Sequence, residues 1–241
     1  MSASPRVVSL VPSATETLLA WGVTPVACTR FCEQPGLPHV GGTKNPDVPA
    51  IVGLAPDVVV MCVEENRRAD AEALGAAGVR TVALSIDGVH DVLPALRKLA
   101  GAIGLDPVEL GLDPASWAAG GEGAASAAPH AVSVFVPIWK RPWMTISGGT
   151  YGSSLLAAVG ARNVFADAAD RYPTVTLPEA RERGPDLVLA PSEPYPFGER
   201  HVPVLEEVAP VVLVDGQDLF WWGARTPGAM RRLRAQLASP R

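Results

Sequence analysis

The sequence predicts an α/β protein of two similar lobes, each a parallel sheet flanked by helices, with a helical connector and a ligand cleft between the lobes. Short β-branched runs alternate with helical patterns along the chain, which is typical of α/β folds. The expected strands are almost continuously apolar, as parallel strands are when helices cover both faces of a sheet. Segments of the first half also recur in the second half, which indicates a repeated lobe.

The first half begins with an apolar strand followed by a clearly delimited helix. Ser13 and Glu16 have the spacing of a capping box at the start of this helix, and Gly22 supplies the left-handed residue expected after its end. The expected elements of this half are a strand at Val7–Val11, a helix at Ser13–Trp21, a strand at Pro25–Thr29, an approach segment at Ile51–Leu54, a strand at Val58–Met61, a helix at Arg68–Ala77 and a strand at Arg80–Leu84.

The second half has the same order of elements. Leu18–Gly22 is similar to Leu156–Gly160, and Ala55–Val60 is similar to Gly184–Leu189, at offsets of 138 and 129 residues. Two similar offsets favour a duplicated topology over chance similarity, which is the alternative. The expected elements are a strand at Val132–Val136, a helix at Tyr151–Val159, an approach segment at Pro178–Arg183, a strand at Leu187–Leu189, a helix at Val202–Val208 and a strand at Val211–Val214.

A connector separates the two halves. Residues 92–103 have apolar side chains at helical spacing and predict the connecting helix. Residues 105–130 are rich in proline, glycine and alanine and predict a loose linker. The expected organisation is therefore an N-terminal lobe at 1–91, a connecting helix and linker at 92–130, and a C-terminal lobe at 131–241.

Composition excludes several classes of protein. Hydrophobic residues make up 48% of the chain and charged residues 19%, so the chain can bury a core, and a net charge of -5 argues against binding nucleic acid. No apolar run approaches the ~20 residues that cross a bilayer, and the first residues lack the pattern of an export signal. We expect a monomer without membrane insertion, cytoplasmic as written and extracytoplasmic if a leader has been removed.

Aromatic residues concentrate in the second half. Eleven of the 14 aromatic residues lie between Phe135 and Trp222, many of them just after expected strands, where ligands bind in parallel α/β sheets. Aromatic walls beside cations suit a large flat ligand that carries acidic groups. The alternative is that loops fold these rings back over the core. The candidate ligand-binding aromatics are Phe31, Trp139, Trp143, Tyr151, Tyr172, Trp221 and Trp222.

Polar candidates follow the expected strands of both halves. Ser13 and Tyr151 stand at helix starts whose N–H groups suit an anion, although plain helix capping explains them as well. Glu64 and Arg67 follow the strand at Val58–Met61, where a solvated helix cap is the alternative. Cys32 is a candidate ligand contact in the loop that also holds Phe31.

Neither a catalytic centre nor a metal site is predicted. The chain has three cysteines, Cys28, Cys32 and Cys62, and their spacing matches neither a disulfide framework nor a tetrahedral zinc pattern, so we interpret them as structural thiols. The four histidines stand in no motif with a nucleophile, and no paired carboxylates have a suggestive spacing. We therefore expect no catalytic residues and no catalytic cofactor.

Three segments resemble the helical-backbone metal receptor superfamily, the substrate-binding proteins of cobalamin, haem and siderophore importers. They are Arg6–Ala20 with its Pro-Ser-x-Thr-Glu, Leu54–Val60, and the Gly184-Pro185-Asp186 repeat. The resemblance covers nearly the whole chain and looks closest to the cobalamin-binding branch. It implies two lobes, a rigid connecting helix and one ligand in the cleft, with Trp143, Tyr172 and Phe220–Trp222 at aromatic wall positions.

The chain also departs from that family. A tryptophan expected after the strand at Val58–Met61 falls on Cys62, and the glutamate that docks an importer of the ABC transporter class falls near Arg68. We therefore expect a non-catalytic binding protein for cobalamin or another corrinoid, without clearly kept importer-docking residues. The alternatives are a haem or ferric-siderophore binder, an enzyme of corrinoid or siderophore processing on the same scaffold, and a regulatory module that reports ligand occupancy.

Overall fold

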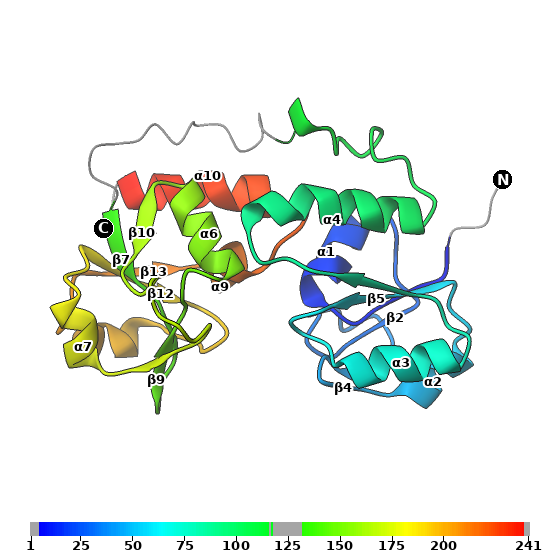
Figure 1. Ribbon diagram of the computed structural model, residues 1–241, viewed down its shortest axis with the longest axis horizontal. Helices are drawn as coiled ribbons and strands as arrows, with labels where there is room; N and C mark the ends of the chain where they lie inside the picture. Colours follow the sequence, from blue (N-terminus) through cyan, green and yellow to red (C-terminus); the bar gives the residue numbers. More distant parts are fainter. Residues whose placement is uncertain (1–4, 116, 118–131, 239–241) are drawn as a thin grey trace. The chain divides into compact units, whose positions relative to one another are not determined.

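The computed structural model describes residues 5–115, 117 and 132–238 (Figure 1). The chain divides into two compact units, and it passes from one to the other more than once. Unit 1 comprises Met1–Ile86, His90–Ala118 and Trp222–Ala224, and unit 2 comprises Asp87–Val89, Ala119–Trp221 and Arg225–Arg241.

Unit 1 is a parallel sheet with helices on both faces. Its strand order is β2-β1-β5-β6, and all neighbouring pairs are parallel. Helices α1 and α4 lie on one side of the sheet and α2 and α3 on the other (Figure 1). The elements are β1 (Val7–Ser9), α1 (Pro12–Ala20), β2 (Ala27–Cys28), β3 (Gly41–Gly42), β4 (Asn45–Pro46), α2 (Val48–Gly53), β5 (Val58–Cys62), α3 (Arg68–Ala76), β6 (Thr81–Leu84) and α4 (Val89–Ala102).

Unit 2 has the same kind of sheet and an additional small one. The parallel sheet has the order β10-β7-β12-β13, and an antiparallel sheet has the order β11-β9-β8. Helices α6, α9 and α10 lie on one side of the parallel sheet and α7 on the other (Figure 1). The elements are β7 (Val132–Phe135), β8 (Pro137–Trp139), β9 (Trp143–Thr145), α6 (Tyr151–Ala158), β10 (Ala161–Asn163), β11 (Thr174–Val175), α7 (Leu177–Glu182), β12 (Leu187–Pro191), η1 (Glu199–His201), α8 (Val202–Leu205), β13 (Val211–Val214), α9 (Gly216–Phe220) and α10 (Thr226–Ala238).

The two parallel sheets share one topology, which confirms the predicted fold class. In each unit the strand that comes first in sequence pairs with the second on one side and with the third on the other, and the fourth stands at the edge. Parallel neighbours require crossover connections, and the intervening helices provide them. The duplicated segments found in the sequence occupy corresponding places in these two sheets.

In both units an aspartate makes the same pair of hydrogen bonds at the amino ends of the two central strands. In unit 1, Arg6 N donates to Asp57 Oδ2 at 2.7 Å, and Asp57 N donates to Arg6 O at 2.8 Å. In unit 2, Ser133 N donates to Asp186 Oδ2 at 2.7 Å, and Asp186 N donates to Ser133 O at 2.8 Å. The Pro-Asp of each duplicated segment therefore fixes the start of β5 against β1 and of β12 against β7.

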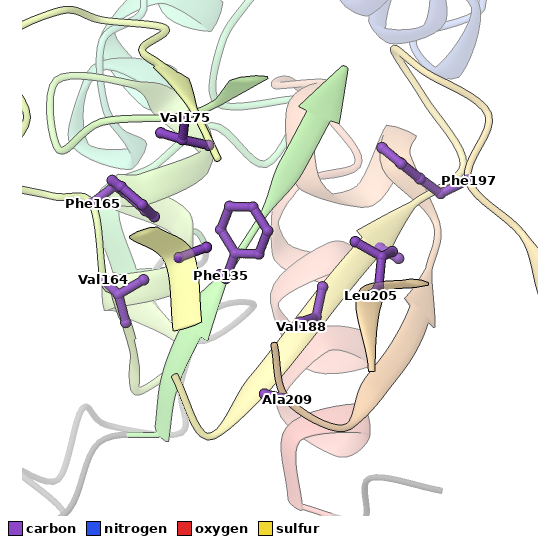
Figure 2. Close-up of a cluster of buried hydrophobic side chains, with 10 residues drawn as sticks. Phe135, Val164, Phe165, Val175, Val188, Phe197, Leu205 and Ala209 are labelled. Carbon is purple, nitrogen blue, oxygen red and sulfur yellow. The ribbon is translucent and has the colours of Figure 1, made fainter. Parts of the chain in front are cut away.

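Each unit has its own apolar core on the sheet. In unit 1, Val8, Val59 and Met61 pack with Ile51 of α2 and Leu74 of α3. In unit 2, Phe135 and Val188 pack with Val164, Phe165, Val175, Leu205 and Ala209, and Phe197 lies at one side of this cluster (Figure 2). Alternation along the strands directs one set of side chains to each face, so the other apolar residues of the same strands meet the helices opposite.

Most predicted elements are present with ends shifted by one to three residues, but the capping box is wrong. Helix α1 begins at Pro12 with Val11 as its N-cap, and no side chain caps it. Ser13 therefore lies inside the first turn, where it cannot act as the cap. Gly22 does adopt the expected left-handed conformation, with φ of 75°.

Several elements were not predicted from the sequence. The antiparallel strands β8, β9 and β11 are only two or three residues long, too short to give a period. Helix α10 was also missed, although Ala229, Met230 and Leu233 bury one of its faces.

The predicted connector and linker are described in part. In the first part of the predicted loose linker, the side chain of Leu112 is buried and its carbonyl accepts a hydrogen bond from Arg97 of α4 at 3.2 Å. Residues 118–130 of that linker lie outside the described residues. Within the described ranges, no helix has the length and apolar character needed to cross a bilayer.

Replacing Asp186 with alanine should destabilise unit 2 by about 1 kcal/mol, a value reduced for the exposure of this carboxylate. Hydrogen bonds from Ser133 lower the pKa of Asp186 below its ordinary value. These hydrogen bonds therefore contribute fully to the free energy of unfolding above ~3.9, the pKa of an aspartate in the unfolded chain. Their contribution is lost as pH falls through the lower pKa of Asp186 in the folded protein. Urea unfolding at pH 7 and at pH 3 measures both effects. An equal loss in the exposed control Asp170→Ala would contradict this role for Asp186.

Candidate functional site

Two loops at the carboxyl edge of the unit 2 sheet bring aromatic side chains together. The chain leaves β7 at Phe135 and continues into the hairpin of β8 and β9, whose ends are Trp139 and Trp143. The second loop leaves β12 and returns to it, because Phe197 N donates to Pro191 O at 3.2 Å. This edge is where parallel α/β sheets bind ligands.

The aromatic cluster consists of Trp139, Trp143, Tyr195, Phe197 and His201. The rings of Trp143 and Phe197 are stacked, with centroids 6.0 Å apart and an interplanar angle of 8°. Trp139 meets Tyr195 edge to face at 5.5 Å. Tyr195 also lies 4.7 Å from Phe197, and both of these rings contact His201 edge to face at about 5.5 Å. These are favourable geometries for aromatic pairs, so the cluster is a pre-formed surface.

The cluster is exposed on one side and anchored on the other. Trp139 is 45% exposed, Trp143 and Tyr195 are half-buried, and Phe197 and His201 are buried. Phe197 belongs to the core of unit 2, near Leu205 in Figure 2. An exposed indole on a rigid aromatic base suits a large flat ligand, since it offers a π face at little entropic cost.

His201 is held as a neutral imidazole beneath this surface. Gly198 N donates to His201 Nδ1 at 3.2 Å, which requires a lone pair on that nitrogen. Burial lowers the pKa of His201 below its ordinary value, and the positive charges of Lys140 and Arg200 lower it further. Burial and these two positive charges therefore disfavour the imidazolium.

Cations stand beside the exposed rings. Lys140 Nζ lies 5.6 Å from the centroid of the Trp143 ring, a cation–π distance. Arg141 is exposed at the tip of the β8–β9 hairpin with φ of 71°. Among the described residues, no carboxylate forms an ion pair with either side chain.

Tyr172 is a second exposed aromatic residue of unit 2. Its side chain is 40% exposed, and it lies just before β11, which pairs with β9. The backbone next to it is fixed, because Thr145 N donates to Pro173 O at 3.1 Å and Ser147 N donates to Arg171 O at 3.0 Å. Tyr172 and the hairpin thus belong to one small sheet.

The adjacent tryptophans Trp221 and Trp222 have different surroundings. Trp221 belongs to unit 2, is half-buried, and has the Arg225 guanidinium 5.4 Å from its ring centroid. Trp222 belongs to unit 1 and is only 4% exposed. The ligand-binding roles predicted for both remain predictions, and Trp221 is the more accessible of the two.

The glycine-rich start of α6 is explained by helix capping and packing. Thr150 is the N-cap, and its Oγ1 accepts from Ser153 N at 3.3 Å. A Cβ at Gly148 would stand 2.5 Å from Ala166 O, so a side chain is excluded there. Tyr151 is 5% exposed, and its hydroxyl hydrogen-bonds to Thr226 at 3.0 Å. Burial raises the pKa of this phenol.

In unit 1, the candidates after β1 and β2 differ in exposure. Phe31 is 49% exposed, with the Arg30 guanidinium 4.7 Å from its ring centroid. Cys32 is buried, and its Sγ accepts from Thr15 Oγ1 at 3.2 Å. Ser13 is also buried, and its carbonyl accepts from Thr17 Oγ1 at 2.8 Å. Of these three residues, Phe31 presents the largest exposed surface.

The loop after β5 is held by a buried asparagine that was missed in the sequence. Asn66 Oδ1 accepts from Cys62 N at 2.7 Å, and its Nδ2 donates to Thr43 O at 2.9 Å. Glu64 is exposed, and its carbonyl accepts from Lys44 Nζ at 2.6 Å. Arg67 is exposed and pairs with Asp70 at 2.8 Å.

The three cysteines are buried free thiols. Burial raises the pKa of Cys28 to about 12, with a further contribution from the neighbouring Cys32, and burial raises that of Cys62 to about 11. Such thiols are poor nucleophiles and poor metal ligands at neutral pH. In the part of the chain that the structure describes, no group of three or more His, Cys, Asp or Glu side chains is placed to hold a metal ion.

Some of the predicted ligand-binding residues lie close together in the structure. It brings Trp139 and Trp143 together and places Tyr172 on the same small sheet. Four residues of this region were not predicted from the sequence as site residues: Lys140, Tyr195, Phe197 and His201. The concentration of aromatics after Phe135 was a signal for Tyr195 and Phe197, whereas nothing in the local sequence indicated His201.

The fold is that of the periplasmic binding proteins. The periplasmic vitamin B12-binding protein BtuF of Vibrio cholerae superposes with a TM-score of 0.77, at 17% identity, over 98% of both chains. The periplasmic haem-binding protein BhuT, solved with two haems, gives 0.81 at 20% identity, also over 98% of both chains.

Sequence relatives point to a narrower group. The vitamin B12-binding protein of Salmonella choleraesuis (strain SC-B67) is 26% identical over 195 residues, which cover 78% of this chain and 72% of the relative. No protein-family model matches the chain. The resemblance predicted from the sequence is confirmed, since the homologues are named vitamin B12-binding proteins and the structural neighbours bind vitamin B12 or haem.

Acidification should destabilise the protein through His201. Folding lowers the pKa of His201. The neutral ring therefore contributes fully to the free energy of unfolding above ~6.5, the pKa of a histidine in the unfolded chain, and this contribution is lost as pH falls through the lower pKa in the folded protein. The free energy of unfolding, measured in urea at pH 7.5 and pH 5.5, should fall less in His201→Gln than in the parent. The control is His90→Gln at an exposed histidine. An equal fall in His201→Gln and the parent would contradict this role.

Proposed function

We propose that this chain is a non-catalytic substrate-binding protein for a large metal-containing macrocycle, with cobalamin or another corrinoid as the first candidate. The aromatic cluster carries the proposal, because it is an exposed, pre-formed aromatic surface at the edge of the sheet where α/β proteins bind ligands. The names of the relatives support the corrinoid. In this proposal the bound macrocycle is cargo, and the protein uses no catalytic cofactor.

Haem is the second candidate ligand. An exposed aromatic ring can stack on a porphyrin as well as on a corrin, and the structural neighbour BhuT is a haem-binding protein. A ferric siderophore is a weaker candidate, since its bulky chelate gains less from a flat aromatic surface. An enzyme of corrinoid or siderophore processing is the rival class.

We assign ligand contact to the predicted site residues that are exposed or half-buried. In unit 2 these are Trp139, Trp143, Tyr172 and Trp221, and in unit 1 they are Phe31, Glu64 and Arg67. The other four predicted residues are buried. We propose that they hold the backbone of the site in place and do not contact the ligand; they are Ser13, Cys32, Tyr151 and Trp222. Each contact is testable separately by substitution.

Delivery to an ABC importer is part of the proposal, as is an extracytoplasmic location. The solved neighbours BtuF and BhuT are named as periplasmic proteins. Cell fractionation with an antibody against this chain would test the location. Co-purification with a membrane permease in the presence of the ligand would test the partnership.

A ligand screen tests the proposed function directly. We expect one-to-one binding of a corrinoid or haem, recovered unchanged, when the protein is incubated with cobalamins, haem and ferric chelates and then analysed by native mass spectrometry. Flat aromatic contact should favour the macrocycles over the chelates. Conversion of any of these compounds to a product would exclude the pure binder.

Trp139→Ala should weaken binding of the macrocycle at least about tenfold, as expected for loss of a large aromatic contact. Stability should change by less than about 1 kcal/mol, because this side chain is 45% exposed. Isothermal titration and thermal unfolding measure the two effects. Trp139→Phe keeps a ring on Tyr195 and should retain most of the affinity. Unchanged binding by Trp139→Ala would remove the aromatic cluster from the site.

A further inference from the structure

The tip of the β8–β9 hairpin carries two cations, Lys140 and Arg141, that form no ion pair with a carboxylate of the described part of the chain. Among the described residues, four arginines of unit 2 are paired, Arg171 with Asp87, Arg183 with Asp167, and both Arg225 and Arg232 with Asp218, whereas Arg181 and Arg200 form no ion pair. Lys140 and Arg141 are distinguished by their place beside the aromatic cluster, in a chain whose net charge is -5.

The position of these cations is defined by the aromatic cluster. Lys140 lies between Trp139 and Arg141 in the sequence, and its Nζ is 5.6 Å from the centroid of Trp143. It is near enough to His201 to influence that buried ring electrostatically, as is Arg200. Arg141 adopts a left-handed backbone with φ of 71°, a conformation that costs free energy for a residue with a side chain. The hairpin thus presents charge at the rim of an apolar surface.

We propose that Lys140 and Arg141 bind an anionic oxygen group on the periphery of the macrocycle that lies on the aromatic cluster. This inference rests on the proposed function and narrows the ligand to one with such a group. A cation forms a stronger, charge-assisted hydrogen bond with an anionic oxygen than with a neutral substituent, so the hairpin can discriminate between the two.

Two kinds of anionic oxygen group meet this requirement. Haem carries propionate carboxylates at one edge, whereas cobalamin has amide side chains and a single phosphodiester in its nucleotide loop. Each macrocycle has a counterpart without the charge. Haemin dimethyl ester lacks free carboxylates, and dicyanocobinamide lacks the nucleotide loop with its phosphodiester.

Titration calorimetry with these four compounds tests the inference. For the macrocycle that binds, the anionic form should bind about tenfold more tightly than its counterpart, as expected for a charge-assisted hydrogen bond. The preference should shrink as salt rises from about 0.05 M to about 0.5 M, because exposed charges are screened. The pair that responds identifies a carboxylate or a phosphodiester as the recognised group.

Substitutions assign the effect to the hairpin. Lys140→Gln and Arg141→Gln should each lower the affinity for the anionic form by up to about tenfold. The affinity for the uncharged counterpart should stay nearly the same. The matched control is Arg181→Gln, at an exposed arginine on α7 of the same unit. Both substituted residues carry charge at or near the surface, so circular dichroism should show an intact fold.

The outcomes separate this inference from the function on which it rests. Equal affinity for the anionic form and its counterpart, or a preference that persists in Lys140→Gln and Arg141→Gln, overturns the inference and leaves the binding function in place. A preference lost equally in Arg181→Gln also overturns it, because general charge would then be the cause. If none of the four compounds binds the parent, the proposed function is wrong and this inference is wrong with it.

Discussion

The contact on which the fold depends is the aspartate that joins the two central strands of each sheet at their amino ends. Asp57 and Asp186 each accept a backbone N–H and return one to the same residue across the strand pair. Parallel strands lack a hairpin to set their register, so a local contact of this kind has to do so. Once the amino ends are in register, the opposite ends of the strands lie level, and the loops there gather at one edge.

The units differ in the segment after their first strand, and this difference creates the aromatic surface. In unit 1 the chain passes from β1 almost directly into α1, whose N-cap is Val11. In unit 2 the β8–β9 hairpin stands between β7 and α6, whose N-cap is Thr150. The offset between equivalent residues accordingly rises from 127 at Arg6 and Ser133 to 138 at Leu18 and Leu156. One insertion into a duplicated topology thus supplies Trp139 and Trp143, which meet Tyr195 and Phe197 of the loop after β12.

The sequence predicted those features of the structure that depend on neighbouring residues and missed those that depend on contacts between distant segments. Apolar strands and glycine stops depend on neighbouring residues, so β13 and the left-handed Gly22 were predicted correctly. The capping box failed because Pro12 begins the helix one residue earlier than the pattern required. His201 contacts Tyr195 and Phe197, and Phe197 stacks on Trp143 from a distant part of the chain. This meeting depends on β7 and β12 being neighbours in the sheet and has no sequence pattern.

The rings proposed to contact a ligand also hold the protein together, and this limits which of them a substitution can change without affecting the fold. Phe197 belongs to the core, and Trp143 stacks on it, so changing either alters folding as well as binding. Trp139 is 45% exposed and stands outside that core. A substitution at Trp139 or at the charged tip of the hairpin therefore tests ligand binding without removing a ring of the core.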